Sequence, residues 1–128
     1  MSDRFQSFEE FWPFYVLEHQ NKTNRLLHFL GTSAAVATAG YALVKRKPGL
    51  LPLALVVGYG PAWIGHFIVE GNRPATFKYP LWSLLGDFRM WGKTLRGTMN
   101  REVERQQAKR EKAETVHAPS NGAAHSVN

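Results

Sequence analysis

Two long apolar runs dominate the pattern of hydrophobic and polar positions. Residues 26–44 and 49–69 contain no Asp, Glu, Lys or Arg. A helix needs roughly 20 apolar residues to cross the bilayer core, and the runs over residues 26–44 and 50–69 each have about that length. Residues 45–49, Lys-Arg-Lys-Pro-Gly, make a short basic turn between them. The pattern predicts an antiparallel membrane hairpin of two spanning helices.

Small residues recur inside both runs. The first run contains Gly31, Ala35 and Ala39 at four-residue spacing, and the second contains Gly58 and Ala62. Small residues at this spacing let two helices approach closely in lipid. Pro61 removes one backbone hydrogen bond and crowds the preceding turn, so we expect a kink in the second helix.

The segment before the hairpin is dense in aromatic residues. Ser7 followed by Glu10 fits a capping box, although Pro13 could instead open the helix. Aromatic residues gather at membrane–water interfaces, so we expect an N-terminal aromatic interfacial helix. The alternative is a soluble aromatic core. The residues concerned are Phe5, Phe8, Phe11, Trp12, Phe14 and Tyr15.

A third helix is predicted to open at Pro80. One face of it is apolar, while Arg89, Lys93 and Arg96 lie on or near the other side. This amphipathic pattern indicates an interfacial or shallow re-entrant helix. The apolar face consists of Leu81, Leu84, Leu85, Phe88, Trp91 and Leu95.

The predicted fold is therefore all-α, with residues 1–99 as a membrane-embedded domain. Residues 100–128 are expected to form a charged helix to about Glu114 and a disordered tail after Thr115. His117 and His125 fall in that tail and receive no role.

Composition narrows the functional classes. The formal net charge of +6 suits nucleic acid or an anionic membrane surface. Because the basic residues flank apolar spans, nucleic acid is not expected as a partner. The chain has no Cys, so a metal ion would need His nitrogens and carboxylate oxygens as ligands. Such ligands suit iron(II), zinc or manganese.

Two histidines lie at matched depth in the predicted hairpin. His28 and His66 are each about 18 residues from the turn, which places both roughly 27 Å from it. Ionisable groups at membrane depth tend to be functional, although each could simply make an interhelical hydrogen bond. His19 precedes His28 by nine residues, so in one continuous helix the two side chains would point to opposite sides. A shared site with His19 therefore requires that the helix be interrupted near residues 21–24.

Carboxylates near these histidines are weaker candidates. Glu70 follows His66 by four residues and could be a ligand or an orienting partner. Its alternative is a salt bridge to Arg25 or Arg73. Asp87 is likewise a candidate metal ligand.

Three stretches carry a family resemblance, and together they span roughly residues 8–97. They resemble the small membrane family that includes the fungal 2-hydroxy fatty acid dioxygenase of phytosphingosine breakdown. The loop after Glu70 has a form associated with bacterial members, whose substrate is less defined. The stretches read FYVLEHQN leading into NRLLHFLGT, GHFIVEGNRPATF, and PLWSLLGDF.

The resemblance implies an iron(II)-dependent alpha-oxidation. A 2-hydroxy fatty acid and O2 would give a fatty acid one carbon shorter, CO2 and water. The family's histidines fall on His19, His28 and His66, with Glu70 and Asp87 as possible carboxylate ligands. The acyl tail would contact membrane lipid.

Two further expectations concern substrate and setting. Arg25 or Arg73 could pair with the substrate carboxylate. The location would be the bacterial inner membrane or, in a eukaryote, the endoplasmic reticulum, and a homo-oligomer is possible.

Two other functions fit the residues. One is a non-enzymatic membrane hairpin or scaffold, which needs no metal. The other is a different His-metal lipid enzyme, such as a zinc-dependent hydrolase. Detection of a bound metal ion would distinguish the dioxygenase from the scaffold, and a requirement for O2 would distinguish the dioxygenase from the hydrolase.

Overall fold

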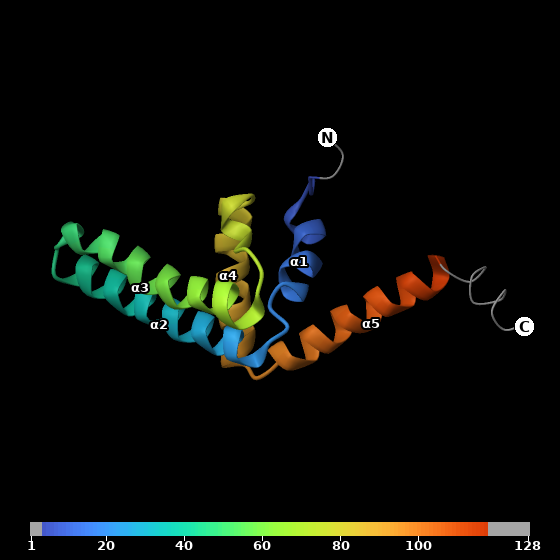
Figure 1. The fold of residues 1–128 in the computed structure, drawn as a ribbon. Helices are drawn as coiled ribbons and strands as arrows, with labels where there is room; N and C mark the ends of the chain where they lie inside the picture. The colour runs from blue at the N-terminus through green and yellow to red at the C-terminus, as the bar shows by residue number, and fades with distance from the viewer. Residues whose placement is uncertain (1–3, 118–128) are drawn as a thin grey trace, which may run out of the picture.

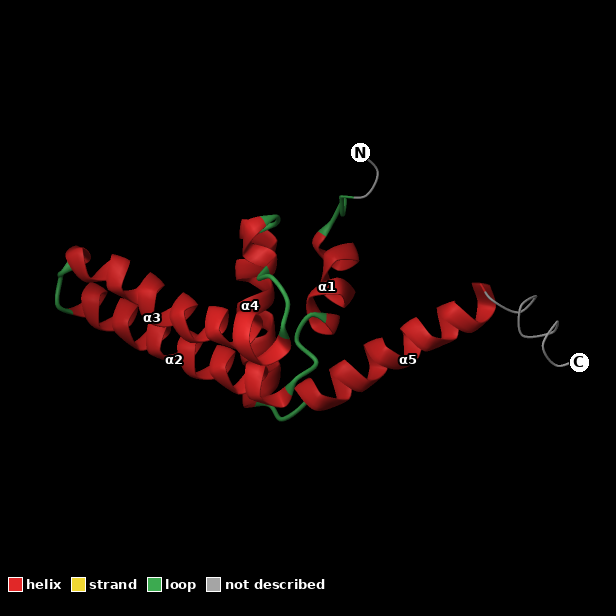
Figure 2. Cartoon of the chain, in the orientation of Figure 1, coloured by secondary structure: helices red, strands yellow, loops and turns green. Residues whose placement is uncertain are grey.

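The computed structural model describes residues 4–117, and this part of the chain contains helices and no strand (Figure 2). The all-α prediction is confirmed. The long helices are α1 (Phe8–Leu17), α2 (Lys22–Val44), α3 (Leu51–Ile64), α4 (Pro80–Leu95) and α5 (Met99–His117). Three short helical segments join them, namely η1 (Pro48–Leu50), η2 (Gly65–Glu70) and η3 (Ala75–Phe77).

Helices α2 and α3 run side by side in opposite directions (Figure 1). Arg46 adopts the left-handed conformation in the turn, with φ of 55°. Small residues bring the two backbones together, because a Cβ on Gly31 would lie 2.6 Å from the carbonyl oxygen of Gly58. The predicted close approach is confirmed.

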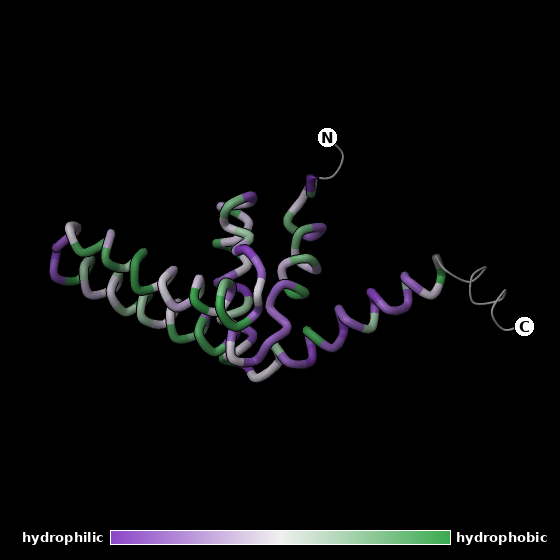
Figure 3. The backbone as a smooth tube through the Cα atoms, in the orientation of Figure 1, coloured by the Kyte–Doolittle hydropathy of each residue, from purple (hydrophilic) through white to green (hydrophobic). Residues whose placement is uncertain are grey.

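The hairpin leaves most of its apolar surface uncovered by the described chain. Two continuous helices, Lys22–Val44 and Pro48–Glu70, are each 23 residues long and apolar enough to cross a membrane. Only 17% and 22% of their most apolar windows are buried, and hydrophobic positions continue along both (Figure 3). A core helix of a water-soluble domain would bury its apolar side chains instead.

Helix α1 starts where the capping box predicted. The Ser7 side chain accepts a hydrogen bond from the Glu10 N–H, and Pro13 lies inside the helix. Its aromatic residues do not form an exposed interfacial face, because Phe11, Trp12 and Tyr15 are buried. They form a packed core, and the location of this helix at a membrane interface stays a prediction. These side chains pack with residues of α4 and α5.

Helix α4 lies across the hairpin beside α1 (Figure 1), and it begins at Pro80 as predicted. Its buried positions are Ser83, Gly86 and Met90. Gly86 admits the Tyr15 ring, since a Cβ there would lie 2.8 Å from a ring carbon. The apolar face predicted for this helix is largely uncovered by the described chain, with Leu81, Leu84, Leu85, Phe88 and Leu95 exposed.

Helix α5 is anchored at its start by one buried carboxylate. Glu102 accepts hydrogen bonds from Trp12 Nε1 at 2.8 Å and from Gln106 Nε2 at 2.9 Å. The helix continues to His117, so the expectation of a disordered tail after Thr115 is wrong for residues 116 and 117. The remainder of that predicted tail, with His125, lies outside the described residues.

Candidate metal centre

A short non-helical loop separates α1 from α2 and contains His19. Helix α1 ends at Leu17 and α2 begins at Lys22. The Asn21 side chain caps α2 by accepting hydrogen bonds from the N–H groups of Thr23 and Asn24. A break between two helices is confirmed, but it covers residues 18–21 and not 21–24, because Lys22, Thr23 and Asn24 already belong to α2. It frees His19 from the helical phase that would have pointed it away from His28.

His66 sits in a π-helical segment. The α-helical pattern of α3 changes at Gly65, and η2 is a π-helix that ends where Gly71 adopts a φ of 78°. The N–H groups of Gly71 and Asn72 both donate to the His66 carbonyl oxygen, at 2.8 and 2.9 Å. Single π turns recur at functional sites because they re-aim side chains.

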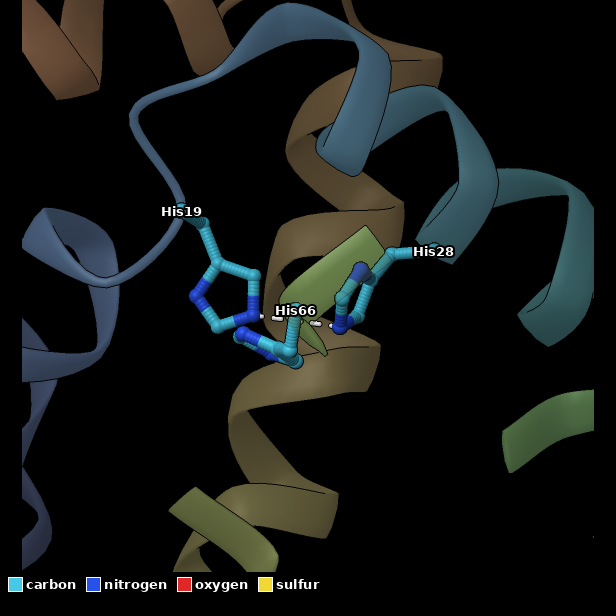
Figure 4. Close-up of side chains that lie close together, drawn as sticks. All are labelled: His19, His28 and His66. Carbon is cyan, nitrogen blue, oxygen red and sulfur yellow. Dashed lines mark hydrogen bonds between the residues drawn. The ribbon is translucent and has the colours of Figure 1, made fainter. Parts of the chain in front are cut away.

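The three predicted histidines meet in one buried cluster (Figure 4). Each of His19, His28 and His66 is at most 4% exposed. The ring centroids are 4.5, 4.5 and 4.8 Å apart, and the ring planes cross at 82°, 77° and 89°. The rings are therefore arranged nearly as three mutually perpendicular planes around one point.

Each ring is held by its Nδ1 atom. Nδ1 of His19 lies 2.6 Å from the Tyr15 carbonyl oxygen, and Nδ1 of His28 lies 2.9 Å from the Asn24 carbonyl oxygen. Carbonyl oxygens only accept, so both Nδ1 atoms carry the proton.

Nδ1 of His66 lies 2.7 Å from Asn72 Oδ1. The Asn72 amide nitrogen donates to the Glu18 carbonyl oxygen at 3.0 Å, which fixes the amide orientation. All three Nδ1 atoms are therefore donors, and all three Nε2 atoms present lone pairs.

This donor set fits a metal ion. Nε2 of His19 and Nε2 of His28 are 3.1 Å apart. Two nitrogens that bind one metal ion at roughly 2.0–2.1 Å lie about 2.9–3.4 Å apart for bond angles from perpendicular to tetrahedral. Lone pairs that face each other at this distance repel unless a cation lies between them. The cluster can thus hold a metal ion, and anchored Nδ1–H groups are the usual support for histidine ligands.

The surroundings keep His19 neutral. Burial lowers its pKa well below the usual value, and the neighbouring His28 and His66 lower it further. A neutral imidazole is the form that binds a metal ion. A proton shared between the rings is therefore disfavoured relative to a metal ion.

The pair formed by Tyr15 and Asp87 packs against the ring of His19. The Tyr15 ring stacks on the His19 ring, with centroids 4.1 Å apart. The Tyr15 hydroxyl donates to the carboxylate of Asp87. Burial raises the pKa of Asp87 to about 7, although the Tyr15 hydrogen bond lowers it. Burial and the Asp87 charge likewise raise the pKa of Tyr15.

The predicted carboxylate ligands lie outside the three-histidine group. Within residues 4–117, that group contains His19, His28 and His66 alone. Glu70 Oε1 instead accepts from the Asn21 N–H and the Asn24 side chain, at 3.0 and 3.1 Å. These contacts hold the start of α2 against the end of η2.

The two predicted carboxylate-binding arginines differ in their surroundings. Arg25 donates to the His19 and Gln20 carbonyl oxygens, both at 2.7 Å, and to Asn100 Oδ1 at 2.8 Å. It therefore fastens the His19 loop to α5. Arg73 is exposed and lies 5.5 Å from the Phe77 ring centroid. Pairing of either arginine with a substrate carboxylate stays a prediction.

Sequence reasoning gave no role to Asn72 or Tyr15. Both occur in the stretches that carry the family resemblance, which is the signal that could have found them. The His19 contact is with the Tyr15 backbone carbonyl four residues earlier, and the His66 contact is with the Asn72 side chain six residues later. A backbone carbonyl carries no residue-type signal, and the Asn72 contact depends on how the chain turns after Glu70, so residue spacing alone does not reveal either.

The fold and the site define a small helical protein with two potential membrane spans and a buried histidine cluster suited to a metal ion. A family model described as 2-hydroxy-palmitic acid dioxygenase Mpo1-like matches residues 5–99, and the chain belongs to this family. The resemblance seen in the sequence is confirmed. No curated protein and no solved structure matches the chain.

Proposed function

We propose that this protein is an iron(II)-dependent dioxygenase that shortens 2-hydroxy fatty acids by one carbon in a membrane. The main support for the proposal is the buried cluster of His19, His28 and His66, whose ligand atoms lie within 4.8 Å of one another. The family name supplies the reaction class, and the histidine ligands are compatible with iron.

The reaction balances without another reductant. A 2-hydroxy acid, R–CH(OH)–COOH, and O2 give R–COOH, CO2 and water. The bond between C1 and C2 breaks, and C1 leaves as CO2. The substrate loses four electrons, which reduce O2 completely. Iron(II), when bound, would supply the one-electron chemistry through which O2 reacts.

The chain's own residues bind and orient the reacting groups. The Nδ1–H hydrogen bonds of His19, His28 and His66 fix the three rings and leave each Nε2 atom with a free lone pair. Burial of the cluster excludes bulk water, which limits side reactions. Asp87 and Tyr15 form a hydrogen-bonded pair behind His19 and hold its ring plane.

The membrane setting follows from the apolar hairpin. We place α2 and the α3–η2 helix across the bilayer, because their exposed side chains are suited to lipid. The histidine cluster then lies at the end of the hairpin far from the turn, near the membrane surface. A fatty acid in a bilayer carries its carboxyl group at the same level.

The experiment uses detergent-purified full chain loaded anaerobically with iron(II). We add 2-hydroxypalmitic acid with and without O2 and look for pentadecanoic acid by mass spectrometry. We expect the product only when iron and O2 are both present. We also expect His28→Ala to lose metal and activity while retaining helical circular dichroism. His117→Ala, at the last residue of α5, is the matched histidine control.

Each contrary outcome rejects a different part of the proposal. Full activity in His28→Ala would remove the site. Iron bound without product would reject this substrate. Product formed without O2 would show that another electron acceptor takes the four electrons and would reject the dioxygenase reaction, and absence of both metal and product would favour a structural hairpin.

A further inference from the structure

A cavity of about 60 Å³ lies between α2, α3 and α4. His28 of the histidine cluster forms part of its wall. Polar groups of Thr32, Tyr59 and Asp87 also line it, and the remaining lining residues are apolar. The cavity therefore adjoins the candidate metal centre and has the mixed polarity of a site for an amphiphilic molecule.

The cavity runs along the hairpin toward its turn. On α2 its wall passes from His28 through Thr32 to Ala35, and on α3 from Ala62 through Gly58 to Ala54. Seven residues of helix from His28 to Ala35 correspond to about 10 Å. Because the histidine cluster lies at the end far from the turn, this direction leads from the membrane surface toward the bilayer centre.

The outer wall is open to lipid. Leu55, Leu84 and Phe88 line the cavity and are 61%, 40% and 46% exposed. They belong to the uncovered apolar surface of α3 and α4. A molecule dissolved in the bilayer can thus reach His28 sideways, between α3 and α4, without passing through water.

The volume of this half-open cavity suits a head group and is too small for a long tail. A cavity needs roughly 10–15 Å³ of such space to hold one water molecule, so about 60 Å³ holds roughly four to six heavy atoms. A 2-hydroxycarboxyl group has five heavy atoms. The rest of a long acyl chain must lie in the groove and in lipid.

We infer that a free 2-hydroxy fatty acid enters this cavity from the bilayer, with its carboxyl end against His28 and its tail directed toward the hairpin turn. The inference rests on the proposed function and deepens it. The orientation matches that of a fatty acid already resident in one leaflet. Selectivity then falls on the first carbons of the chain, because only they are enclosed, and the far end of the chain is unrestricted.

The test measures equilibrium binding of radiolabelled 2-hydroxypalmitic acid to the iron-loaded full chain in lipid nanodiscs without O2. Empty nanodiscs give the blank, and metal content is measured for every variant. Leu84→Trp places a large ring in the cavity wall and should weaken binding at least tenfold. Leu85→Trp changes the neighbouring lipid-facing leucine, which does not line the cavity, and should leave binding and metal content unchanged.

A second pair of probes examines the enclosed end of the chain. 2-Hydroxy-3,3-dimethylhexadecanoic acid carries its bulk beside the reacting carbon and should bind at least tenfold more weakly than 2-hydroxypalmitic acid. The 15,15-dimethyl isomer should bind normally.

The outcomes separate this inference from the proposed function. Binding of 2-hydroxypalmitic acid that Leu84→Trp leaves intact would overturn the inference and leave the dioxygenase proposal standing. Equal binding of the two dimethyl isomers would overturn it as well. An iron-loaded wild-type protein that binds no 2-hydroxypalmitic acid would overturn both.

Discussion

Asn72 offers a direct test of how the histidine cluster is held. Its amide accepts from His66 Nδ1 at 2.7 Å and donates to the Glu18 carbonyl oxygen at 3.0 Å. The residue therefore ties the π-helical segment to the loop that carries His19. Asn72→Ala removes both hydrogen bonds and leaves His66 free to rotate or to change tautomer.

The expected loss is in metal affinity. Removing the hydrogen-bond partner of a metal-binding histidine typically costs 10–100-fold in affinity, or about 1.4–2.7 kcal/mol. Asn72→Asp is the matched control, because it keeps an acceptor for the His66 Nδ1–H. A carboxylate acceptor also raises the basicity of the ring. The Asp variant should therefore bind metal with an affinity close to that of wild type, and no more weakly than the Ala variant.

The assay is an anaerobic titration with cobalt(II), followed by its visible absorption in detergent-solubilised protein. Circular dichroism checks that each variant keeps its helices. If Asn72→Ala binds cobalt(II) within twofold of wild type, then Asn72 does not orient His66. The tautomer of His66 would then not depend on this hydrogen bond.

Two further predictions concern stability. Gly31→Ala should lower the free energy of unfolding by about 1–3 kcal/mol, since its Cβ would meet the Gly58 carbonyl oxygen. Gly40→Ala is the control, because a Cβ there would have nothing within 4 Å, and it should leave the free energy of unfolding unchanged or raise it by up to about 1 kcal/mol. Equal denaturation midpoints of the two variants in detergent would contradict the expected difference. Burial by itself raises the pKa of Glu102, but hydrogen bonds from Gln106, Arg105 and Trp12 outweigh the effect of burial. The pKa of Glu102 is therefore about 2, against an ordinary value of 4.5. Because the folded pKa is the lower one, the stabilisation is present above about pH 5 and is lost as the pH falls toward 2. Thermal unfolding from pH 7 to 3 should show this loss in wild type and less of it in Glu102→Gln; identical pH profiles would refute it.

Local pattern explains most of the correct predictions about the elements. The uncharged runs over residues 26–44 and 49–69 predicted the hairpin, because a long helix without charged residues has few other stable settings. The level of His28 and His66 follows from counting residues to the turn, since the helical rise is constant. The break before Lys22 followed from Asn21, whose side chain satisfies the free N–H groups at a helix start.

The contacts that the sequence did not predict arise where a side chain's environment depends on distant elements. The aromatic residues of α1 suit a membrane interface by composition, but α4 and α5 cover them and make them a core. Glu70 has the spacing of a ligand to His66, and its carboxylate accepts hydrogen bonds from Asn21 and Asn24. The guanidinium of Arg25 donates to backbone carbonyls of the adjacent loop. The roles expected for Glu70 at a metal ion and for Arg25 at a substrate carboxylate stay predictions.

The sequence by itself determined the helical class, the two apolar spans and the three histidines that could share a site, because each depends on composition or on spacing along one helix. Only the tertiary structure decided how those histidines are oriented. Their Nδ1 atoms are fixed by the Tyr15 and Asn24 carbonyls and by the Asn72 side chain, and the π turn at Gly65–Glu70 presents His66 to the other two. A metal site requires lone pairs that converge within a few ångströms, and that convergence arises when separate segments pack together.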